Sequence, residues 1–351
     1  MKKIINWINH LQMEKITDWI KHHQIAVFFL ITFAISWGLG FSWGAVLNRD
    51  QGLLLPLAFI TACGPGLAGI IINAITNTQP REGSRKAFWI AFFMAWFLSA
   101  VISFANLKFV DHFPLSPVVV VPFTIATVPV AFVIASAFSR IPSVRHYLAS
   151  LIQLRDVWPW AILALVLFPA LLLFSFPVYG ILNRLPILFY QFQESGSALL
   201  GLIAVKFFYQ LFFFNATGEE TGWRGFALPR LQSHFSPLIA ALIIAFFWVP
   251  WHFFGWQAEG QSVLTIQFWV EMFIGHILLS VLIVWICNRA GGSILVAGIA
   301  HAATNTVQAF VPIQDMRSLF LTLFIAVVVL ILVDRMWEKL PADHPVVYRL
   351  P

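Results

Sequence analysis

Long apolar segments separated by short polar loops dominate the chain. A helix that crosses the hydrocarbon core of a bilayer needs about 20 predominantly apolar residues, and ten segments approach or exceed that length. Prolines inside several of them predict kinks, so the limits are approximate. The pattern predicts an all-α fold, a polytopic transmembrane helical bundle of about ten spans. The expected spans are residues 25–47, 53–75, 87–107, 117–138, 157–182, 197–228, 237–254, 267–287, 293–311 and 317–334.

The first 24 residues differ from the rest because apolar side chains are mixed there with four lysines. This mixture is typical of an amphipathic helix on the membrane surface and not of a signal peptide. We expect four regions in chain order. They are the surface segment 1–24, the N-terminal transmembrane helices 25–190, a region 195–311 that holds the embedded polar residues, and a last span with its tail, 312–351.

The composition supports a bilayer as the main partner. Of the residues, 60% are hydrophobic and only 10% are charged, whereas soluble domains carry roughly 25% charged residues. The 36 Phe and 15 Trp also suit lipid and its interfaces. The net charge of +6 is spread over many loops and forms no basic patch, so we expect no nucleic-acid partner.

The basic residues alternate between successive loops. Sixteen Lys and Arg residues lie on one side, in the N-terminal segment, the C-terminal tail and every second loop, with Arg224 counted at the adjoining end of the sixth span. The other loops hold only Arg49, Lys108, Arg184 and Arg317. Because cytosolic loops carry the excess of Lys and Arg, this asymmetry predicts that both termini are cytosolic. We expect a multi-pass protein of the cell membrane.

Embedded polar groups gather in the sixth, seventh and ninth predicted spans, while the first five spans are almost purely apolar. An ionisable side chain in hydrocarbon costs at least ~2.5 kcal/mol on insertion scales, so such groups need a reason to be there. The clusters contain Asn215, Glu219, Glu220 and Arg224 in the sixth span, Trp248 and His252 in the seventh, and His301 and Asn305 in the ninth.

Helical spacing assigns different tasks to the two acids of the sixth span. Glu220 and Arg224 are four residues apart and can pair on one helix face, which would keep this acid ionised and structural. Glu219 points about 100° away, on the face of Asn215 and Trp223. We therefore expect Glu219 to be free for proton transfer.

The spacing also predicts how these helices meet. Gly218 and Gly222 form a ridge of small residues that lets a neighbouring helix approach closely. His301 lies ~12 Å into its span from the cytosolic end, and Asn305 lies one turn deeper on the same face. His252 reaches a comparable depth or more. We expect these groups to line one pocket below the inner leaflet, with the carboxyl and imidazole groups of Glu219, His252 and His301 within about 8 Å.

Such a pocket fits the hydrolysis of an acyl bond by activated water. A carboxylate beside an imidazole can accept a proton from water. A second imidazole and an Asn amide can donate hydrogen bonds to the oxyanion that develops on the carbonyl. No nucleophilic Ser or Cys is required.

The three clusters resemble the motifs of the CAAX protease and bacteriocin-processing family (CPBP, or Abi), which includes the Ras-converting prenyl-protein endopeptidases. The resemblance lies in Glu219-Glu220-x-x-x-Arg224, an aromatic residue four positions before His252, and His301-x-x-x-Asn305, in that order, over roughly residues 195–310. Trp248 departs from the family, which usually has Phe at that position.

The resemblance implies an intramembrane endopeptidase with Glu219 as the water-activating acid, helped by His252. It also implies that His301 and Asn305 stabilise the oxyanion, with Glu220 and Arg224 in support. Family members are often called metalloproteases. Glu219, His252 and His301 could hold a divalent metal such as zinc or form a metal-free acid–base site, and we favour the latter. The implied substrate is a membrane-associated peptide or protein, prenylated or not, cleaved near the cytosolic leaflet.

Two other functional classes stay open. A transporter would show broken polar helices in matched halves of the chain, and the first five spans have none, which disfavours transport. A non-catalytic relative, such as an immunity or scaffold protein, would carry the same motifs without using them.

The remaining polar and sulfur-containing residues have structural interpretations. Cys63 and Cys287 lie in apolar runs and are expected to be small buried residues. Ser293 follows two glycines at the start of the ninth span and is expected to cap that helix. Lys206 and Glu271 are expected to pair near the outer face. His276 is a further buried ionisable residue.

Overall fold

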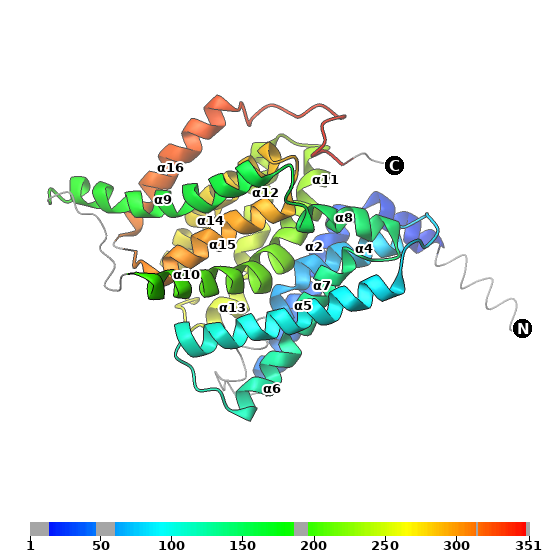
Figure 1. Ribbon diagram of the computed structural model, residues 1–351. Coiled ribbons are helices and arrows are strands. Elements are labelled where there is room, and N and C mark those ends of the chain that lie inside the picture. The colour runs from blue at the N-terminus through cyan, green and yellow to red at the C-terminus, as the bar shows by residue number, and fades with distance from the viewer. Residues whose placement is uncertain (1–13, 47–59, 186–195, 314, 349–351) are drawn as a thin grey trace, which may run out of the picture.

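The computed structural model describes residues 14–46, 60–185, 196–313 and 315–348. Within these ranges every regular element is a helix, which confirms the all-α prediction. Figure 1 shows them as one bundle. The elements are α2 (Gln24–Val46), α4 (Gly64–Ile75), α5 (Arg85–Ala105), η1 (Asn106–Val110), α6 (Pro117–Ala126), α7 (Val128–Ser136), α8 (Pro142–Ile152), α9 (Trp158–Leu182), α10 (Ser197–Gln210), η2 (Leu211–Ala227), α11 (Leu228–Gln232), α12 (Pro237–Trp251), α13 (Phe253–Ala258), α14 (Ile266–Arg289), α15 (Ile294–Phe310) and α16 (Met316–Val333).

Eight helical stretches of the described residues are long and apolar enough to cross a membrane. Two more of the predicted spans contain the shorter apolar helices α4 and α15. The transmembrane bundle is thus confirmed, and the count of ten spans stays a prediction. Of the expected surface segment, residues 14–22 are helical and residues 1–13 lie outside the described residues.

The loops that are rich in Lys and Arg meet at one end of the bundle. Arg230 Nε donates to Gln24 Oε1 at 2.6 Å, and Gln232 Nε2 donates to Val346 O at 3.1 Å. Further hydrogen bonds join the other loops of this end to one another and to these residues. We call it the basic end; it comprises residues 24, 76–84, 137–141, 229–236, 290–293 and 334–348.

The described parts of the other loops lie at the opposite end, where Lys206 of α10 pairs with Asp111, just after η1, at 3.3 Å. Figure 1 shows the same separation, with the start of α2 and helix α11 to the right and the start of α10 to the left. Successive spans therefore run in alternate directions, as the charge pattern predicts. That the basic end faces the cytosol stays a prediction.

The helix η2, which carries the two acids, is wound as a π-helix. The backbone N–H of Leu228 donates to Trp223 O, five residues earlier, and the hydroxyl of Thr217 donates to Phe212 O. In an α-helix the corresponding bonds join residues four apart. π-Winding is rare and is found mostly at functional sites. It changes which side chains of this helix share a face.

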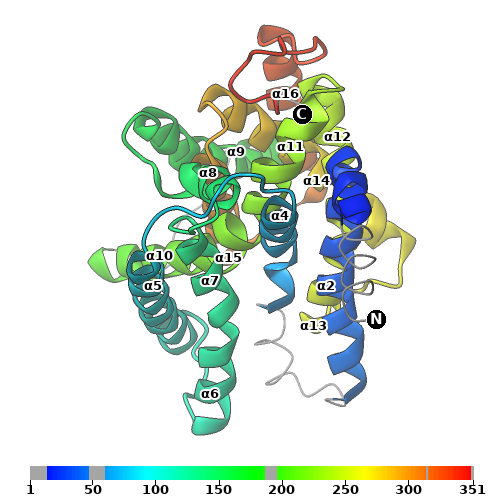
Figure 2. The ribbon, with the colours of Figure 1, turned by 90° about the vertical axis from the view of Figure 1, so that its right-hand side faces the viewer.

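Small residues bring α4 and α15 close to η2, as the glycine ridge predicts. A Cβ atom added at Gly218 would lie 2.6 Å from Ala62 O, and one at Gly222 would lie 2.2 Å from Pro65 Cβ. On another side of η2, a Cβ at Gly298 of α15 would lie 2.4 Å from Ala216 Cβ. Both neighbours therefore pack against the η2 backbone. Figure 2 shows α4 and α2 on one side of the molecule and α5, α6 and α7 on the other.

Replacing Gly222 with alanine should destabilise this packing. The added methyl would meet the ring and the backbone of Pro65, which cannot move as a flexible side chain would. Overpacking of this kind typically costs about 1–3 kcal/mol, so the thermal unfolding midpoint in detergent should fall. Gly201→Ala is the matched control, since nothing lies within 4 Å of its added Cβ. Equal midpoints for both variants would contradict the close packing.

A proline places His252 at a helix junction. Pro250 has no backbone N–H and its ring crowds the preceding turn, so it tends to kink or end a helix. Accordingly α12 ends at Trp251 and α13 begins at Phe253. His252 lies between them, and this position turns its ring toward η2.

Candidate active site

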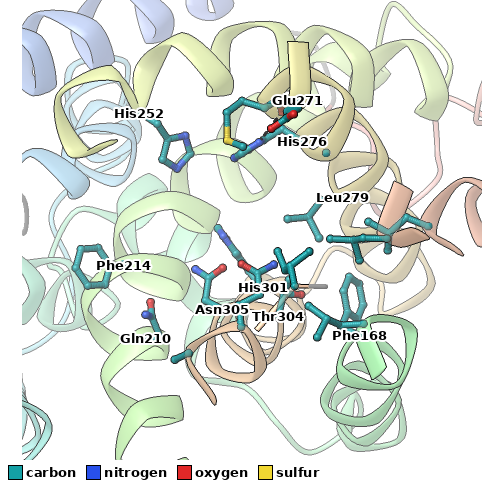
Figure 3. Close-up of a pocket in the computed structure, with 18 of the residues that line it drawn as sticks. Phe168, Gln210, Phe214, His252, Glu271, His276, Leu279, His301, Thr304 and Asn305 are labelled. Carbon is teal, nitrogen blue, oxygen red and sulfur yellow. Dashed lines mark hydrogen bonds between the residues drawn. The ribbon is translucent and has the colours of Figure 1, made fainter. Parts of the chain in front are cut away.

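The predicted residues line a common cavity of about 490 Å³. Helices α9, α10, α14, α15 and α16 form its wall together with η2 and the α12–α13 junction (Figure 3). Glu219, His252, His301 and Asn305 all contribute to the lining. Glu219 and His301 are buried, while His252 and Asn305 are partly exposed toward the cavity.

Glu219 is held by the helix that carries His252. Trp248 donates its indole N–H to Glu219 Oε2 at 2.5 Å, and His252 Nε2 lies 3.5 Å from the same oxygen. The His252 ring stacks on Trp256, with ring centroids 4.7 Å apart and an interplanar angle of 12°. These contacts fix the carboxylate and the imidazole side by side at the cavity wall.

Hydrogen bonding determines which nitrogen of His252 carries a proton. Its Nδ1 lies 2.9 Å from the carbonyl oxygen of Trp248, which can only accept, so Nδ1 is the protonated nitrogen. In the neutral ring Nε2 is then an acceptor that faces another acceptor, the Glu219 carboxylate. One added proton satisfies both groups. The pair is therefore arranged to accept a proton from a bound water and to pass it on.

Glu220 forms a buried triad with two basic side chains, Arg224 and His301. Glu220 Oε1 lies 2.9 Å from Arg224 Nη1 and 2.9 Å from His301 Nδ1. The Arg224 guanidinium also donates to the hydroxyl of Ser280 at 3.3 Å and lies 4.6 Å from the centroid of the Trp248 ring. The predicted pairing of Glu220 with Arg224 is confirmed. The contact with His301 was not predicted.

This contact gives His301 a defined orientation. An ionised carboxylate accepts only, so His301 donates from Nδ1, and its Nε2 is left for the cavity. Asn305 follows one turn later and lines the same cavity, as predicted from the spacing. The ring of His301 lies at 89° to the ring of Trp248, with centroids 5.1 Å apart. The same indole therefore contacts both His301 and Glu219.

Some predictions about this region are wrong. Asn215 and Trp223 do not line the cavity with Glu219: Asn215 is fully buried, and Trp223 packs in the core against Trp251 with a centroid distance of 5.9 Å. Lys206 pairs with Asp111 and not with Glu271, which accepts a hydrogen bond from Gln267 at 2.9 Å.

The structure adds a third imidazole to the cavity. His276 of α14 lies with its ring centroid 5.1 Å from His252 and 4.9 Å from Trp248. Its Nδ1 is 2.8 Å from Met272 O. In the sequence His276 lies in a span outside the three polar clusters, and no spacing rule connects it with them.

The described residues do not bring three His, Cys, Asp or Glu side chains together in a group that could hold a metal ion. His301 is turned toward Glu220, whereas His252 is turned toward Glu219. The candidate metal set of Glu219, His252 and His301 therefore does not fit this geometry. The preference for a metal-free site stays a prediction.

Other expectations about single residues are confirmed. Cys63 and Cys287 are buried free thiols. Ser293 caps α15, since its hydroxyl accepts a hydrogen bond from Val296 N at 3.2 Å.

Comparison with known proteins agrees with the motifs. A family model described as type II CAAX prenyl endopeptidase Rce1-like matches residues 198–307. CAAX prenyl protease 2 of Methanococcus maripaludis is 27% identical over 262 residues, which cover 72% of this chain and 94% of that protein. The matched region contains every residue of the two buried clusters. Both matches support a CPBP-type, Rce1-like endopeptidase region in the second half of this multi-pass membrane protein.

Proposed function

We propose that this protein is an intramembrane endopeptidase that hydrolyses a peptide bond of a membrane-associated substrate with water activated by Glu219 and His252. The observation that carries the proposal is the 3.5 Å approach of His252 Nε2 to Glu219 Oε2 at the wall of the cavity. The two acceptors can hold one added proton between them, which lets the pair act as a general base on water.

The reaction begins when the Glu219–His252 pair takes a proton from water. The water oxygen adds to the carbonyl carbon of the scissile bond, and negative charge collects on the carbonyl oxygen. The Asn305 amide donates to that oxygen, and so does His301 from Nε2 when Glu220 on Nδ1 supports its protonated ring. The pair then returns the proton to the amide nitrogen, the C–N bond breaks, and a carboxylic acid and an amine leave.

The lining of the cavity supports an apolar or lipidated substrate. Phe168, Leu172, Leu279, Phe320 and Leu323 form part of its wall, on α9, α14 and α16. Pockets for apolar ligands combine such a wall with a few placed polar groups. A lipid chain or apolar side chain next to the scissile bond would pack there.

Direct hydrolysis tests the proposal. Purified full-length protein is incubated with lipidated and unlipidated membrane peptides, and fragments are identified by mass spectrometry. We expect wild type to release a fragment with a new carboxyl terminus and Glu219→Ala to release none. Fragments formed equally by both proteins, or no fragment from any peptide, would contradict the function and favour a non-catalytic relative.

Trp248→Phe should slow turnover while leaving the fold intact. The change keeps an aromatic ring but removes the N–H that donates to Glu219 at 2.5 Å. Hydrogen bonds to charged groups contribute about 1.5–3 kcal/mol, so kcat should fall by roughly 10- to 100-fold.

A matched control exists for this variant. Trp285 also donates its indole N–H to a carboxylate at 2.5 Å, but the acceptor is Asp334 at the basic end. Trp285→Phe should keep wild-type kcat. If both variants are equally slow, the loss comes from general destabilisation and the indole of Trp248 has no role in positioning Glu219.

A further inference from the structure

The cavity is open toward one end of the bundle. Among its lining residues Glu259, Gln308 and Ile313 are exposed. They lie after α13 and at the end of α15, which is the end opposite to the basic end. The mouth of the cavity is therefore formed by the loops that carry few basic residues.

Within the described residues, packed core closes the cavity toward the basic end. Three residues of the lining lie ten positions from the helix terminus that points toward the basic end. They are Phe168 in α9 (158 to 168), Leu279 in α14 (279 to 289) and Leu323 in α16 (323 to 333). The buried Glu220–Arg224 pair and large apolar side chains of the core fill the space between. A peptide has no comparable path from that side.

A second cavity reaches the same carboxylate from the same end. It measures about 90 Å³, lies between α2 and the α12–α13 junction, and shares Glu219, His252, Trp256 and Glu259 with the first. Both routes to Glu219 thus pass Glu259 at the mouth.

The side chains at the mouth are suited to water. Lys206, Gln210, Glu259, Glu271 and Gln308 line this part of the cavity, whereas its deeper wall on α9, α14 and α16 is apolar. Charged side chains in membrane proteins usually face a water-filled cavity or a partner and not lipid. The mouth therefore opens into an aqueous compartment.

The charge of the loops identifies that compartment. Loops rich in Lys and Arg stay in the cytosol, and in this protein they form the end away from the mouth. We propose that the mouth faces the extracytoplasmic side and that the substrate is a peptide anchored in the outer leaflet. The identity of the substrate rests on the proposed function, whereas the direction of the mouth does not. This reverses the expectation from the sequence of cleavage near the cytosolic leaflet.

Cysteine labelling tests the direction of the mouth without any need for catalysis. Gln308→Cys and Glu259→Cys place a thiol at the mouth, and Arg81→Cys places one on the exposed loop of the basic end. Wild type is the blank, because Cys63 and Cys287 are buried. Each full-length variant is expressed in bacteria, and intact spheroplasts are treated with a membrane-impermeant maleimide before or after permeabilisation.

We expect the cysteines at positions 308 and 259 to react in intact spheroplasts and the cysteine at position 81 to react only after permeabilisation. The opposite result would show a cytosolic mouth and overturn the proposal. Failure of both mouth cysteines to react even after permeabilisation would show a closed mouth and overturn it as well.

A second measurement tests the substrate class. The same peptide is attached to a lipid anchor in the outer leaflet or to one in the cytosolic leaflet of expressing cells. Cleavage confined to the outer-leaflet peptide is expected, and cleavage confined to the cytosolic peptide would overturn the inference. If neither is cleaved while the mouth cysteines are labelled from outside, the assigned substrate class is wrong together with the proposed function, and the sidedness stands.

Discussion

Replacing Glu219 with glutamine should lower kcat by about 10²- to 10⁴-fold, the usual contribution of a general base. Glutamine keeps the size of the side chain and can still accept a hydrogen bond from Trp248, but its amide cannot take a proton from water. Because the cavity keeps its shape, KM should change little. Steady-state hydrolysis of the best peptide from the panel, with the thermal midpoint of each protein, provides the measurement.

Two further variants bracket this result. Glu219→Asp keeps the carboxylate but withdraws it from Trp248 and His252, so its kcat should lie between those of wild type and Glu219→Gln. Glu82→Gln removes an exposed carboxylate on a loop of the basic end and should behave as wild type. Wild-type turnover by Glu219→Gln would remove this residue from the mechanism.

Replacing Arg224 with methionine should destabilise the protein by about 3–5 kcal/mol, the usual cost of leaving one partner of a buried ion pair alone. Both members of the pair are buried, and Glu220 Oε2 and Arg224 Nε already have no hydrogen-bond partner among the described atoms. Methionine fills much of the space but supplies no charge. The thermal midpoint in detergent should fall sharply, and the yield of folded protein should fall with it.

A double variant separates the cost of an unpaired charge from the cost of altered packing. Glu220→Met combined with Arg224→Met removes both charges, and buried pairs replaced by apolar residues of similar volume often lose no stability. Its midpoint should recover most of the loss, while kcat stays low because His301 has lost its Nδ1 partner. A double variant as unstable as Arg224→Met would show that packing and not charge sets the cost.

Apolar length and charge were sufficient to predict the main features of the fold. Long apolar runs are confined to helices in a bilayer because the backbone must bond to itself there. The alternation of basic loops correctly predicted which loops meet, as the contact between Arg230 and Gln24 shows. Four polar residues of the cavity wall, Glu219, His252, His301 and Asn305, were also predicted, because polar side chains are rare enough in spans to stand out.

Predictions from local spacing failed where the packing partner of a side chain could not be deduced from the sequence. The α-helical period placed Trp223 beside Glu219, but Trp223 is packed in the core and does not line the cavity. The link between Glu220 and His301 joins residues 81 positions apart, and no periodicity predicts it. Lys206 was assigned to the wrong acid for the same reason, since Asp111 is 95 positions away.

The proposed direction of the mouth differs from the expected side of cleavage for a different reason. Counting residues from the cytosolic end gives the depth of His301, but a group near the middle of a bundle can be reached from either end. Which end is open depends on how large side chains such as Trp223 and Trp248 fill the space around the site. That packing is a property of the whole bundle.

The most direct test of the central claim, that Glu219 and His252 act on one water as a unit, is a double-mutant cycle on kcat. Residues that act as a unit are strongly non-additive. Glu219→Gln combined with His252→Asn should therefore be about as slow as the slower single variant. Rate losses that multiply in the double variant would show that the two side chains work independently, and would contradict the shared proton on which the proposed mechanism rests.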